Sequence, residues 1–355
     1  MCSVPTYDLT RFAKRFSWQI DGRSDVAQCL TRKMEELKMK IKKLISVAII
    51  FTMIVSILTG CSTKQAEQPK QPEAPTETDT PLTATDPAGN EITIPGDIEA
   101  IISMAPSITE VLVDLGYKDK IIAADTQSKI LGILPEDLPY IDLMSPDIEQ
   151  IIALNPDFIF ATGMMMVEGN DPFKPVTDLG TPVAYIPSSK SIEEIYNDIM
   201  FISKVMKEEE KGQKIVDNMK EKIADIKAIG DTITDKKSVY FEIGAAPYMY
   251  SFGKGVFLNE MIELIGATNA LGNQESWISV SDEAVLAANP DVIITNVNYI
   301  EDPVDEIKTR SGWESIKAIQ NDEVYYVDNM KSSLPNHNIV IALEEMAKAV
   351  YPDKY

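Results

Sequence analysis

Short apolar runs alternate, from about Thr83 onward, with stretches whose apolar residues recur at three-and-four spacing. Residues 99–104 and 120–124 are predicted strands, and between them Ser107 and Glu110 have the spacing of a capping box that opens a helix. Such alternation is typical of parallel α/β structure. Because open α/β sheets bind ligands at the carboxyl ends of their strands, the turn after the first of these strands is a candidate ligand site.

The same pattern contains an internal repeat. Residues 149–160, EQIIALNPDFIF, recur as residues 283–294, EAVLAANPDVII, at a constant offset of 134. Each copy predicts a helix, a break at Asn-Pro-Asp and a buried strand. Ser145 and Ser279 precede the two leading glutamates by four residues and are candidate N-caps. Two copies predict two similar α/β lobes.

Between the two copies lies a long charged stretch that predicts a connecting helix. Another helix, opened by Ser191 with Glu194, precedes it. In residues 207–229, Gly212 weakens the start of the helix by about 1 kcal/mol relative to alanine. The apolar residues keep three-and-four spacing on one face, which predicts about six helical turns; they are Ile215, Met219, Ile223 and Ile226.

A different pattern precedes residue 83. A cationic segment at residues 40–43 is followed by an uncharged run of 16 residues, 44–59, and then by Gly60-Cys61. This order predicts a secretory signal over residues 39–60. The run is short of the ~20 residues that span a bilayer comfortably. A single transmembrane anchor is the alternative, and its positive flank predicts the same extracytoplasmic orientation.

The segments on either side of this signal differ from it. Residues 1–38 show no helical stripe, and we expect them to be an upstream extension, with Met39 as the natural initiator. Residues 61–82 are mostly Lys, Gln, Glu, Pro, Thr and Ala, a composition that cannot bury a core. They therefore predict a flexible tether.

Composition narrows the function further. The chain has 33 basic and 55 acidic residues, a net charge of −22, and no basic patch outside its N-terminus, which excludes nucleic-acid binding. Ten basic and five acidic residues precede Cys61, so a mature chain beginning there carries 23 basic and 50 acidic residues, a charge of −27. One histidine excludes a multi-histidine zinc site, and three cysteines exclude a disulfide framework. Hydrolase, metalloprotease, phosphate-loop and dinucleotide motifs are all missing from the sequence, which argues against an enzyme.

Taken together, these motifs resemble the substrate-binding lipoproteins of ABC importers, of the iron-siderophore, haem and cobalamin group. The resemblance covers roughly residues 94–352. The residues that carry it are IISMAPSITE at 101–110, the two Glu…Asn-Pro-Asp blocks, GVFLNEMIELIG at 255–266, and Gly312-Trp313 followed by VYYVD at 324–328. Leu-Thr-Gly-Cys likewise resembles a lipobox, which implies that Cys61 is lipidated and becomes the mature N-terminus.

The resemblance implies an α/β fold with two similar Rossmann-like lobes, a single long α-helix joining them and a ligand cleft between them. We expect an N-terminal lobe over residues 83–206, the connecting helix over 207–230 and a C-terminal lobe over 231–355. It also implies that Glu149 and Glu283 dock on arginines of a dimeric ABC permease, one glutamate per lobe. The alternative is that both are first-turn acids favoured by the helix dipole.

Candidate ligand contacts follow from the same resemblance. Trp277 stands where cobalamin-binding members carry a cleft tryptophan, but its repeat counterpart is Leu143, which is not aromatic. Aromatic and thioether side chains suit large flat ligands. The further candidates for the cleft are Tyr248, Tyr250, Met104, Met164 and Met165. A surface hairpin is the alternative for the tyrosines, and core filling is the alternative for the methionines.

His337 and Arg310 bear on the chemistry of the ligand. His337 could ligate a haem iron or a cobalt, or could be a polar residue at a helix start. Arg310 is the one arginine after the signal, which favours a nearly neutral ligand, although Lys254 and Lys331 leave an anionic one open.

The expectation is a monomeric receptor on the extracytoplasmic face of a bacterial membrane, held there by its lipid. It would have no catalytic cofactor and would deliver a metal chelate, either cobalamin, haem or a ferric siderophore, to an ABC permease. An enzyme, or an adhesion or signalling module on the same scaffold, is the alternative. The sequence leaves open which chelate binds, and whether the membrane is that of a Gram-positive surface or faces a periplasm.

Overall fold

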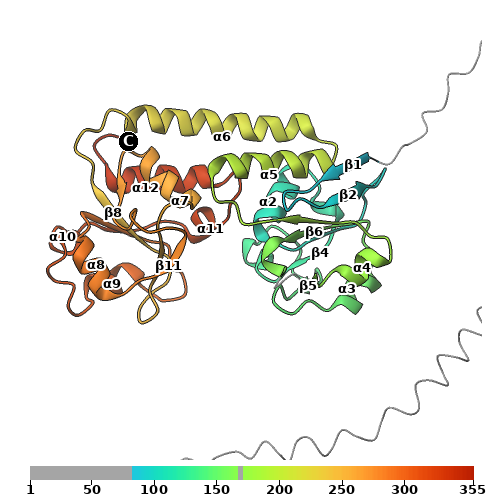
Figure 1. Cartoon of the computed structure of the whole chain (residues 1–355), viewed down its shortest axis with the longest axis horizontal. Helices are drawn as coiled ribbons and strands as arrows, with labels where there is room; N and C mark the ends of the chain where they lie inside the picture. Colours follow the sequence, from blue (N-terminus) through green and yellow to red (C-terminus); the bar gives the residue numbers. More distant parts are fainter. Residues whose placement is uncertain (1–81, 167–170) are drawn as a thin grey trace, which may run out of the picture. The chain divides into compact units, whose positions relative to one another are not determined.

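A computed structural model of the chain describes residues 82–166 and 171–355. It has an α/β fold with two parallel sheets, each in its own lobe (Figure 1). The first sheet has the strand order β5-β4-β3-β6-β7, and every neighbouring pair is parallel. Its strands are β3 (Ile101–Ser103), β4 (Ile121–Asp125), β5 (Tyr140–Ile141), β6 (Phe158–Thr162) and β7 (Val183–Ile186). The two strands predicted around residues 99–104 and 120–124 are thus confirmed as β3 and β4.

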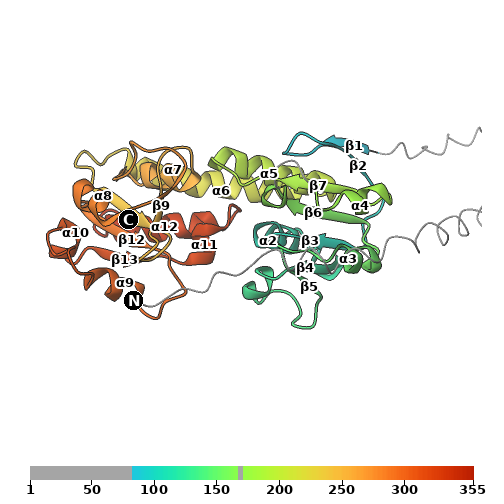
Figure 2. The ribbon, with the colours of Figure 1, turned by 60° about the horizontal axis from the view of Figure 1, so that its bottom comes forward.

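The second sheet has the order β10-β8-β12-β13 and is also parallel throughout. Its strands are β8 (Ser238–Glu242), β10 (Thr268–Asn269), β12 (Val292–Thr295) and β13 (Val324–Tyr326). Two antiparallel pairs complete the strands: β1 (Leu82–Thr85) with β2 (Glu91–Ile94), and β9 (Tyr250–Phe252) with β11 (Trp277–Ser279). The β1–β2 pair lies beside β7 (Figure 2), where the buried Asp86 carboxylate accepts the backbone N–H of Tyr185 at 2.8 Å.

Helices cover both faces of the first sheet. Successive strand residues point to opposite sides, and apolar side chains on both sides need to be buried. Ile101, Phe158 and Phe160 pack into one core with helices α2 and α5, whereas Ile102 and Ile159 pack into another with α3 and α4. These helices are α2 (Pro106–Asp114), α3 (Ile148–Leu154), α4 (Lys174–Asp178) and α5 (Ile192–Val205), with short 3₁₀ turns at η3 (Lys118–Lys120), η4 (Ser128–Leu131) and η5 (Gly163–Met165).

The second lobe is built in the same way. Val239, Phe241 and Ile294 face α7 and α12, while Tyr240 and Ile293 face a core that includes residues of α8, α9 and α10. The helices of this lobe are α7 (Phe257–Leu264), α8 (Asp282–Ala288), α9 (Pro303–Lys308), α10 (Lys317–Gln320), α11 (Asn329–Ser333) and α12 (Ile339–Val350).

The predicted connecting helix is confirmed as α6 (Glu209–Gly230), which packs against α5 and also against α7 and α12 (Figure 1). Its buried residues, including Val216 and Ile223, belong to a hydrophobic core that contains residues of both lobes. A Cβ on Gly212 would lie 2.0 Å from Ser203 Oγ, and a Cβ on Gly230 would lie 2.2 Å from the carbonyl oxygen of Leu264. Glycine therefore lowers the helix propensity of α6 but allows each of its ends to approach a neighbouring lobe closely.

The sequence repeat has a backbone explanation. Asn155 and Asn289 end α3 and α8 in the left-handed conformation, with φ of 51° and 45°, which asparagine tolerates better than most residues. The aspartates two residues later bind the backbone N–H groups that begin neighbouring strands: Asp157 accepts from Ala100, and Asp291 accepts from Ser238, both at 2.9 Å. The Asn-Pro-Asp break thus ends a helix and holds the start of the strand that pairs with the one that follows it.

Three predicted helix caps are wrong, while the Ser191 cap of α5 is confirmed by a hydrogen bond from Glu194 N–H at 3.1 Å. The repeat helices begin later than predicted, because the side chains of Asp147 and Ser281, rather than Ser145 and Ser279, accept the first-turn hydrogen bonds. The N-cap of α2 is Ala105 with Pro106 in the first turn, so Ser107 is already inside the helix and forms no capping box with Glu110.

The signal, the proposed lipidation site Cys61, almost all of the tether and the upstream extension lie outside the described residues. Their boundaries, and those of the lobes, stay predictions. Among residues 82–166 and 171–355, no helix combines the length and the hydropathy that crossing a membrane requires.

Candidate functional site

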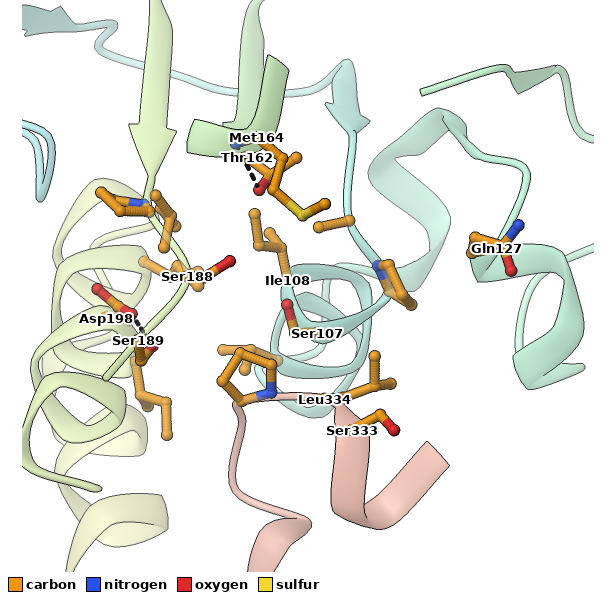
Figure 3. A pocket seen from close by; sticks show the side chains of 18 of the residues that line it. Ser107, Ile108, Gln127, Thr162, Met164, Ser188, Ser189, Asp198, Ser333 and Leu334 are labelled. Atoms are coloured by element: carbon orange, nitrogen blue, oxygen red, sulfur yellow. Dashed lines mark hydrogen bonds between the residues drawn. The ribbon is translucent and has the colours of Figure 1, made fainter. Parts of the chain in front are cut away.

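The candidate site is a cavity of about 300 Å³ at the carboxyl edge of the first sheet (Figure 3). It is bounded by the segments that follow β3, β4, β5, β6 and β7, by α2 and α5, and by three residues of the second lobe. The turn after β3, predicted as a ligand site, lines it. The full lining is Ala105, Pro106, Ser107, Ile108, Val111, Gln127, Leu143, Thr162, Met164, Ile186, Pro187, Ser188, Ser189, Asp198, Ile199, Ile202, Ser333, Leu334 and Pro335.

The walls of this cavity are mostly apolar, with hydroxyl groups set among them. Ile108 and Val111 on α2, and Ile199 on α5, contribute to the apolar wall and also belong to the hydrophobic core. Figure 3 shows Met164, Ser107 and Ser188 pointing toward the same space from three sides. An apolar cavity with a few converging polar groups is the usual form of a small-molecule site.

A buried hydrogen-bond chain holds one wall in place. Ser103 Oγ lies 2.8 Å from Thr109 Oγ1, which lies 2.9 Å from Ser128 Oγ, and Ser128 in turn donates to the Asp125 carboxylate. Asp125 also accepts the backbone N–H of Gln127 at 2.8 Å. Burial raises the pKa of Asp125, and the hydrogen bonds that it accepts oppose this shift. The chain therefore fixes the backbone that carries Gln127 into the cavity.

Asp198 is the one cavity-lining residue with a formal charge at neutral pH. It projects from α5, is 9% exposed, and accepts the hydroxyl of Ser189 at 2.7 Å through Oδ2 (Figure 3). Burial raises the pKa of Asp198 to about 6, with a smaller contribution from the charge of Glu194 and an opposing one from the Ser189 hydrogen bond. Sequence reasoning missed this residue, because its position on α5 resembles an ordinary polar site within an amphipathic helix.

The second lobe reaches the cavity through the segment 333–335, which is held against α2. Glu110 of α2 is buried; its Oε1 accepts Lys331 Nζ at 3.0 Å, and its Oε2 accepts Asn336 Nδ2 at 2.6 Å. Lys331 precedes the segment 333–335 in the sequence and Asn336 follows it, so Glu110 holds the segment at both ends. Asn296 Nδ2 adds a bond to Ser333 Oγ at 3.0 Å. Glu110 therefore positions a wall of the cavity instead of capping its own helix.

The predicted aromatic contacts lie elsewhere. Trp277 and Tyr250 are each 40% exposed on the β9–β11 pair, and Tyr248, in the turn before it, is 88% exposed. None of the three lines the cavity, whereas Leu143, the repeat counterpart of Trp277, does line it. The structure thus favours the surface alternative for the two tyrosines, and contact of any of the three with the ligand stays a prediction.

The three candidate methionines separate into two environments. Met164 is 63% exposed and lines the cavity. Met104 and Met165 are 0% and 6% exposed and pack in the core between the first sheet and its α3–α4 face. The prediction that Met104 and Met165 line a cleft is wrong, because strand alternation and the η5 turn direct both side chains into the core.

His337 does not line the cavity either. Its Nε2 lies 2.8 Å from Asp114 Oδ2 on α2, and this hydrogen bond lowers the pKa of Asp114. His337 is 12% exposed and directly precedes Asn338, the N-cap of α12, so the structure places it as a polar residue at a helix start, which was the alternative to metal ligation. No group of three or more His, Cys, Asp or Glu side chains suited to a metal occurs among the described residues. Metal ligation by His337 stays a prediction.

Arg310 is committed to a buried network in the second lobe. Nη1 and Nη2 each lie 2.9 Å from an oxygen of Glu242, the guanidinium also pairs with Glu306, and it stacks on Trp313 at 4.3 Å from the ring centre. Trp313 is held in turn by a 2.7 Å bond from its Nε1 to Asp282. Arg310 is therefore not available to an anionic ligand. Lys331 pairs with Glu110, and Lys254 does not line the cavity.

Glu149 and Glu283 occupy matching positions. Each is exposed, and each is the second residue of a seven-residue helix, α3 in one lobe and α8 in the other (Figure 1). A hydrogen bond involving Ser281 lowers the pKa of Glu283. Within residues 82–166 and 171–355, neither carboxylate forms an ion pair.

Substituting Asp198 with asparagine is expected to stabilise the protein at pH 7.5. The folded-state pKa of about 6 lies above the ordinary value of 3.8, so the folded state binds the proton more tightly and loses stability as pH rises between these values. Removing the charge should raise the free energy of unfolding by on the order of 2–3 kcal/mol at pH 7.5 and by almost nothing at pH 3.5. Urea unfolding at both pH values measures this. Equal effects of the substitution at both pH values would contradict a raised pKa.

Comparison with known proteins identifies the family. The periplasmic binding protein model matches residues 101–330. The chain is 30% identical over 304 residues to an uncharacterized ABC transporter substrate-binding lipoprotein, YvrC, of Bacillus subtilis, covering 84% of this chain and 94% of YvrC. It is 27% identical to a vitamin B12-binding protein of Vibrio parahaemolyticus, covering 71% of this chain and 89% of that protein.

A solved structure agrees with these sequence matches. A Staphylococcus epidermidis protein described as a possible iron-binding (periplasmic solute-binding) protein is 28% identical, with a TM-score of 0.62, covering 72% of this chain and all but 1% of the other. The two-lobed fold predicted from the sequence is therefore confirmed. The chain belongs to the periplasmic binding protein family, of the iron and vitamin B12 type, and is a substrate-binding protein of an ABC transporter and not an enzyme.

Proposed function

We propose that this protein is anchored by a lipid on the extracytoplasmic face of a bacterial membrane and delivers a metal chelate, either cobalamin, haem or a ferric siderophore, to an ABC permease. The observation that carries the proposal is the cavity itself, which lies at the carboxyl edge of a parallel sheet and is closed by residues of the second lobe. Its apolar wall and the hydroxyl groups set in it suit a ligand with both apolar and hydrogen-bonding surface.

The lipid anchor rests on the sequence. Cys61 follows an apolar run and the Leu-Thr-Gly tripeptide of a lipobox, and the similar YvrC is named a lipoprotein. Anchoring at Cys61 leaves residues 62–81, twenty residues of tether, before β1. A tether of this composition would hold the binding unit near the membrane and let it rotate toward a permease.

Docking would use Glu149 and Glu283. Both are exposed and unpaired within the described residues, and their helices occupy equivalent places in the two halves of the repeat. A permease dimer offers two equivalent surfaces, so one carboxylate per lobe would match it. Bidentate arginine–carboxylate pairs would fix the orientation of the bound receptor.

Binding of a chelate to this cavity is the test of the proposed function. Purified protein is expected to melt roughly 5 °C higher with a saturating cognate ligand among cyanocobalamin, haem and ferric hydroxamate siderophores. Ser188→Trp should remove this shift, because exposed Ser188 lines the cavity and the indole would fill it. Ser311→Trp makes the same change at an exposed position outside the cavity and should retain the shift. No shift with any chelate, or equal shifts in both variants, would refute the assignment.

A further inference from the structure

We propose that the cavity selects for a chelate arm that donates hydrogen bonds and carries no negative charge, such as an ammonium or an amide, and that Asp198 is the residue that selects it. This inference rests on the proposed function and adds the class of ligand. Two observations support the inference: the charges of the residues that line the cavity, and the hydrogen bonding of Asp198.

The charge of the lining is the first argument. Lysine, arginine and histidine are all missing from the residues that line the cavity, and Asp198 is the one ionisable group among them. Two cations of the second lobe are engaged elsewhere: Arg310 with Glu242 and Glu306, and Lys331 with Glu110. Lys190 follows Ser189 in the chain, but it lines the adjoining pocket and not this cavity. An anionic arm would lose its hydration in this apolar space without gaining a cationic partner, and such burial is costly.

The geometry of Asp198 is the second argument. Oδ2 accepts the Ser189 hydroxyl at 2.7 Å, which fixes the carboxyl group at the wall of the cavity (Figure 3). Oδ1 accepts no hydrogen bond from any of the described residues, and it is not among the fully buried atoms that lack a partner. Oδ1 therefore has an acceptor position open to a donor from outside the protein, and Asp198 lines an adjoining pocket as well as this cavity. Charge-assisted hydrogen bonds of this kind are roughly twice as strong as neutral ones.

The size of the cavity limits what it holds. About 300 Å³ is at the lower end for a drug-sized ligand, so a large chelate would place one arm here and leave the rest outside. The apolar residues Ile108, Val111 and Ile199 would surround the methylene stem of such an arm, and its donor would reach Asp198. Amide arms on a corrin and the amine-ended arm of a linear hydroxamate share this chemistry.

Matched ligands test this selection without changing the chelate. The first set is ferrioxamine B, with a terminal ammonium, its N-acetyl derivative and its anionic N-succinyl derivative. The second set is cyanocobalamin and a monocarboxylic acid derivative in which one amide has become a carboxylate. Titration calorimetry at pH 7.5 gives the dissociation constants for the wild-type protein, Asp198→Asn and, as the matched control, Asp225→Asn on the exposed face of α6.

Wild-type protein is expected to bind the carboxylate-bearing member of the recognised set at least about ten-fold more weakly than its donor-bearing partner. Asp198→Asn should reduce that difference, because the repulsion by the carboxylate is lost while the cost of desolvating the anionic arm remains, and Asp225→Asn should preserve it in full. The set that binds identifies the chelate as a hydroxamate siderophore or a corrin. Equal affinity for both members, or a preference of undiminished size in Asp198→Asn, would overturn the inference and leave the proposed function standing. Absence of binding by both sets and by haem would overturn the proposed function and the inference with it.

Discussion

Cells that depend on this protein for uptake are expected to lose transport when Glu149→Ala and Glu283→Ala are combined, while the purified double variant retains its ligand affinity. The two carboxylates are exposed on α3 and α8 and are not among the residues of the cavity. Removing them should therefore abolish productive docking without altering the ligand site. Each single variant should reduce uptake only in part, because the other lobe would still dock.

The helix dipole provides the competing explanation, and a matched pair of substitutions separates the two. Glu209 and Glu210 are also exposed acids in the first turn of a helix, α6. Glu209→Ala combined with Glu210→Ala removes the same charge and the same dipole interaction away from the proposed docking surface. Uptake of labelled ligand and binding to permease in nanodiscs should be lost in the first double variant and normal in the second. If ligand affinity fell while docking persisted, the docking role would be wrong.

Truncating Arg310 is expected to cause the largest loss of stability. Arg310→Ala should lower the free energy of unfolding by about 3–5 kcal/mol, because it leaves the carboxylate of Glu242, which is 0% exposed, without its cationic partner. It also removes the stacking of the guanidinium on Trp313. Glu242 ends β8 at the carboxyl edge of the second sheet, so the unpaired carboxylate should destabilise the core of the second lobe.

An exposed ion pair supplies the control for this measurement. Lys227 and Asp231 lie 2.6 Å apart at the end of α6, and both side chains are more than half exposed. Lys227→Ala should change the free energy of unfolding by less than about 1 kcal/mol. Chemical denaturation of both variants compares the two. An Arg310→Ala effect no larger than the Lys227→Ala effect would show that Glu242 is satisfied without the arginine.

Local pattern predicted the strands, the helices and the repeat because each depends on residues close together in the chain. The Asn-Pro-Asp breaks at 155–157 and 289–291 were visible as a repeat, and their left-handed asparagines explain it. Caps were less predictable, since several polar residues near a helix start compete for the same N–H groups. The N-caps are Asp147 and Ser281, which lie nearer the first turn than Ser145 and Ser279 do.

The site was only partly predictable. The turn after β3 followed from the rule that ligands bind at the carboxyl ends of parallel strands, and that turn lines the cavity. Sequence pattern could not distinguish Met164, which is in the cavity, from Met104 and Met165, which are in the core, since all three are apolar residues at strand ends. No motif marks Asp198, because its burial and its raised pKa depend on neighbours supplied by other elements.

The sequence by itself determined the fold class, the two lobes, the long helix and the family of this protein, because hydrophobic periodicity and short motifs act over a few turns of chain. Only the tertiary structure decided that Glu110 anchors the 333–335 segment, that Arg310 lies in a buried network, and that Asp198 is the one charged residue in the lining of the cavity. Glu110 and Asn336 are 226 positions apart, and Arg310 and Glu242 are 68 apart. Burial and pairing across such separations depend on which surfaces meet when the lobes fold, and no local pattern records that.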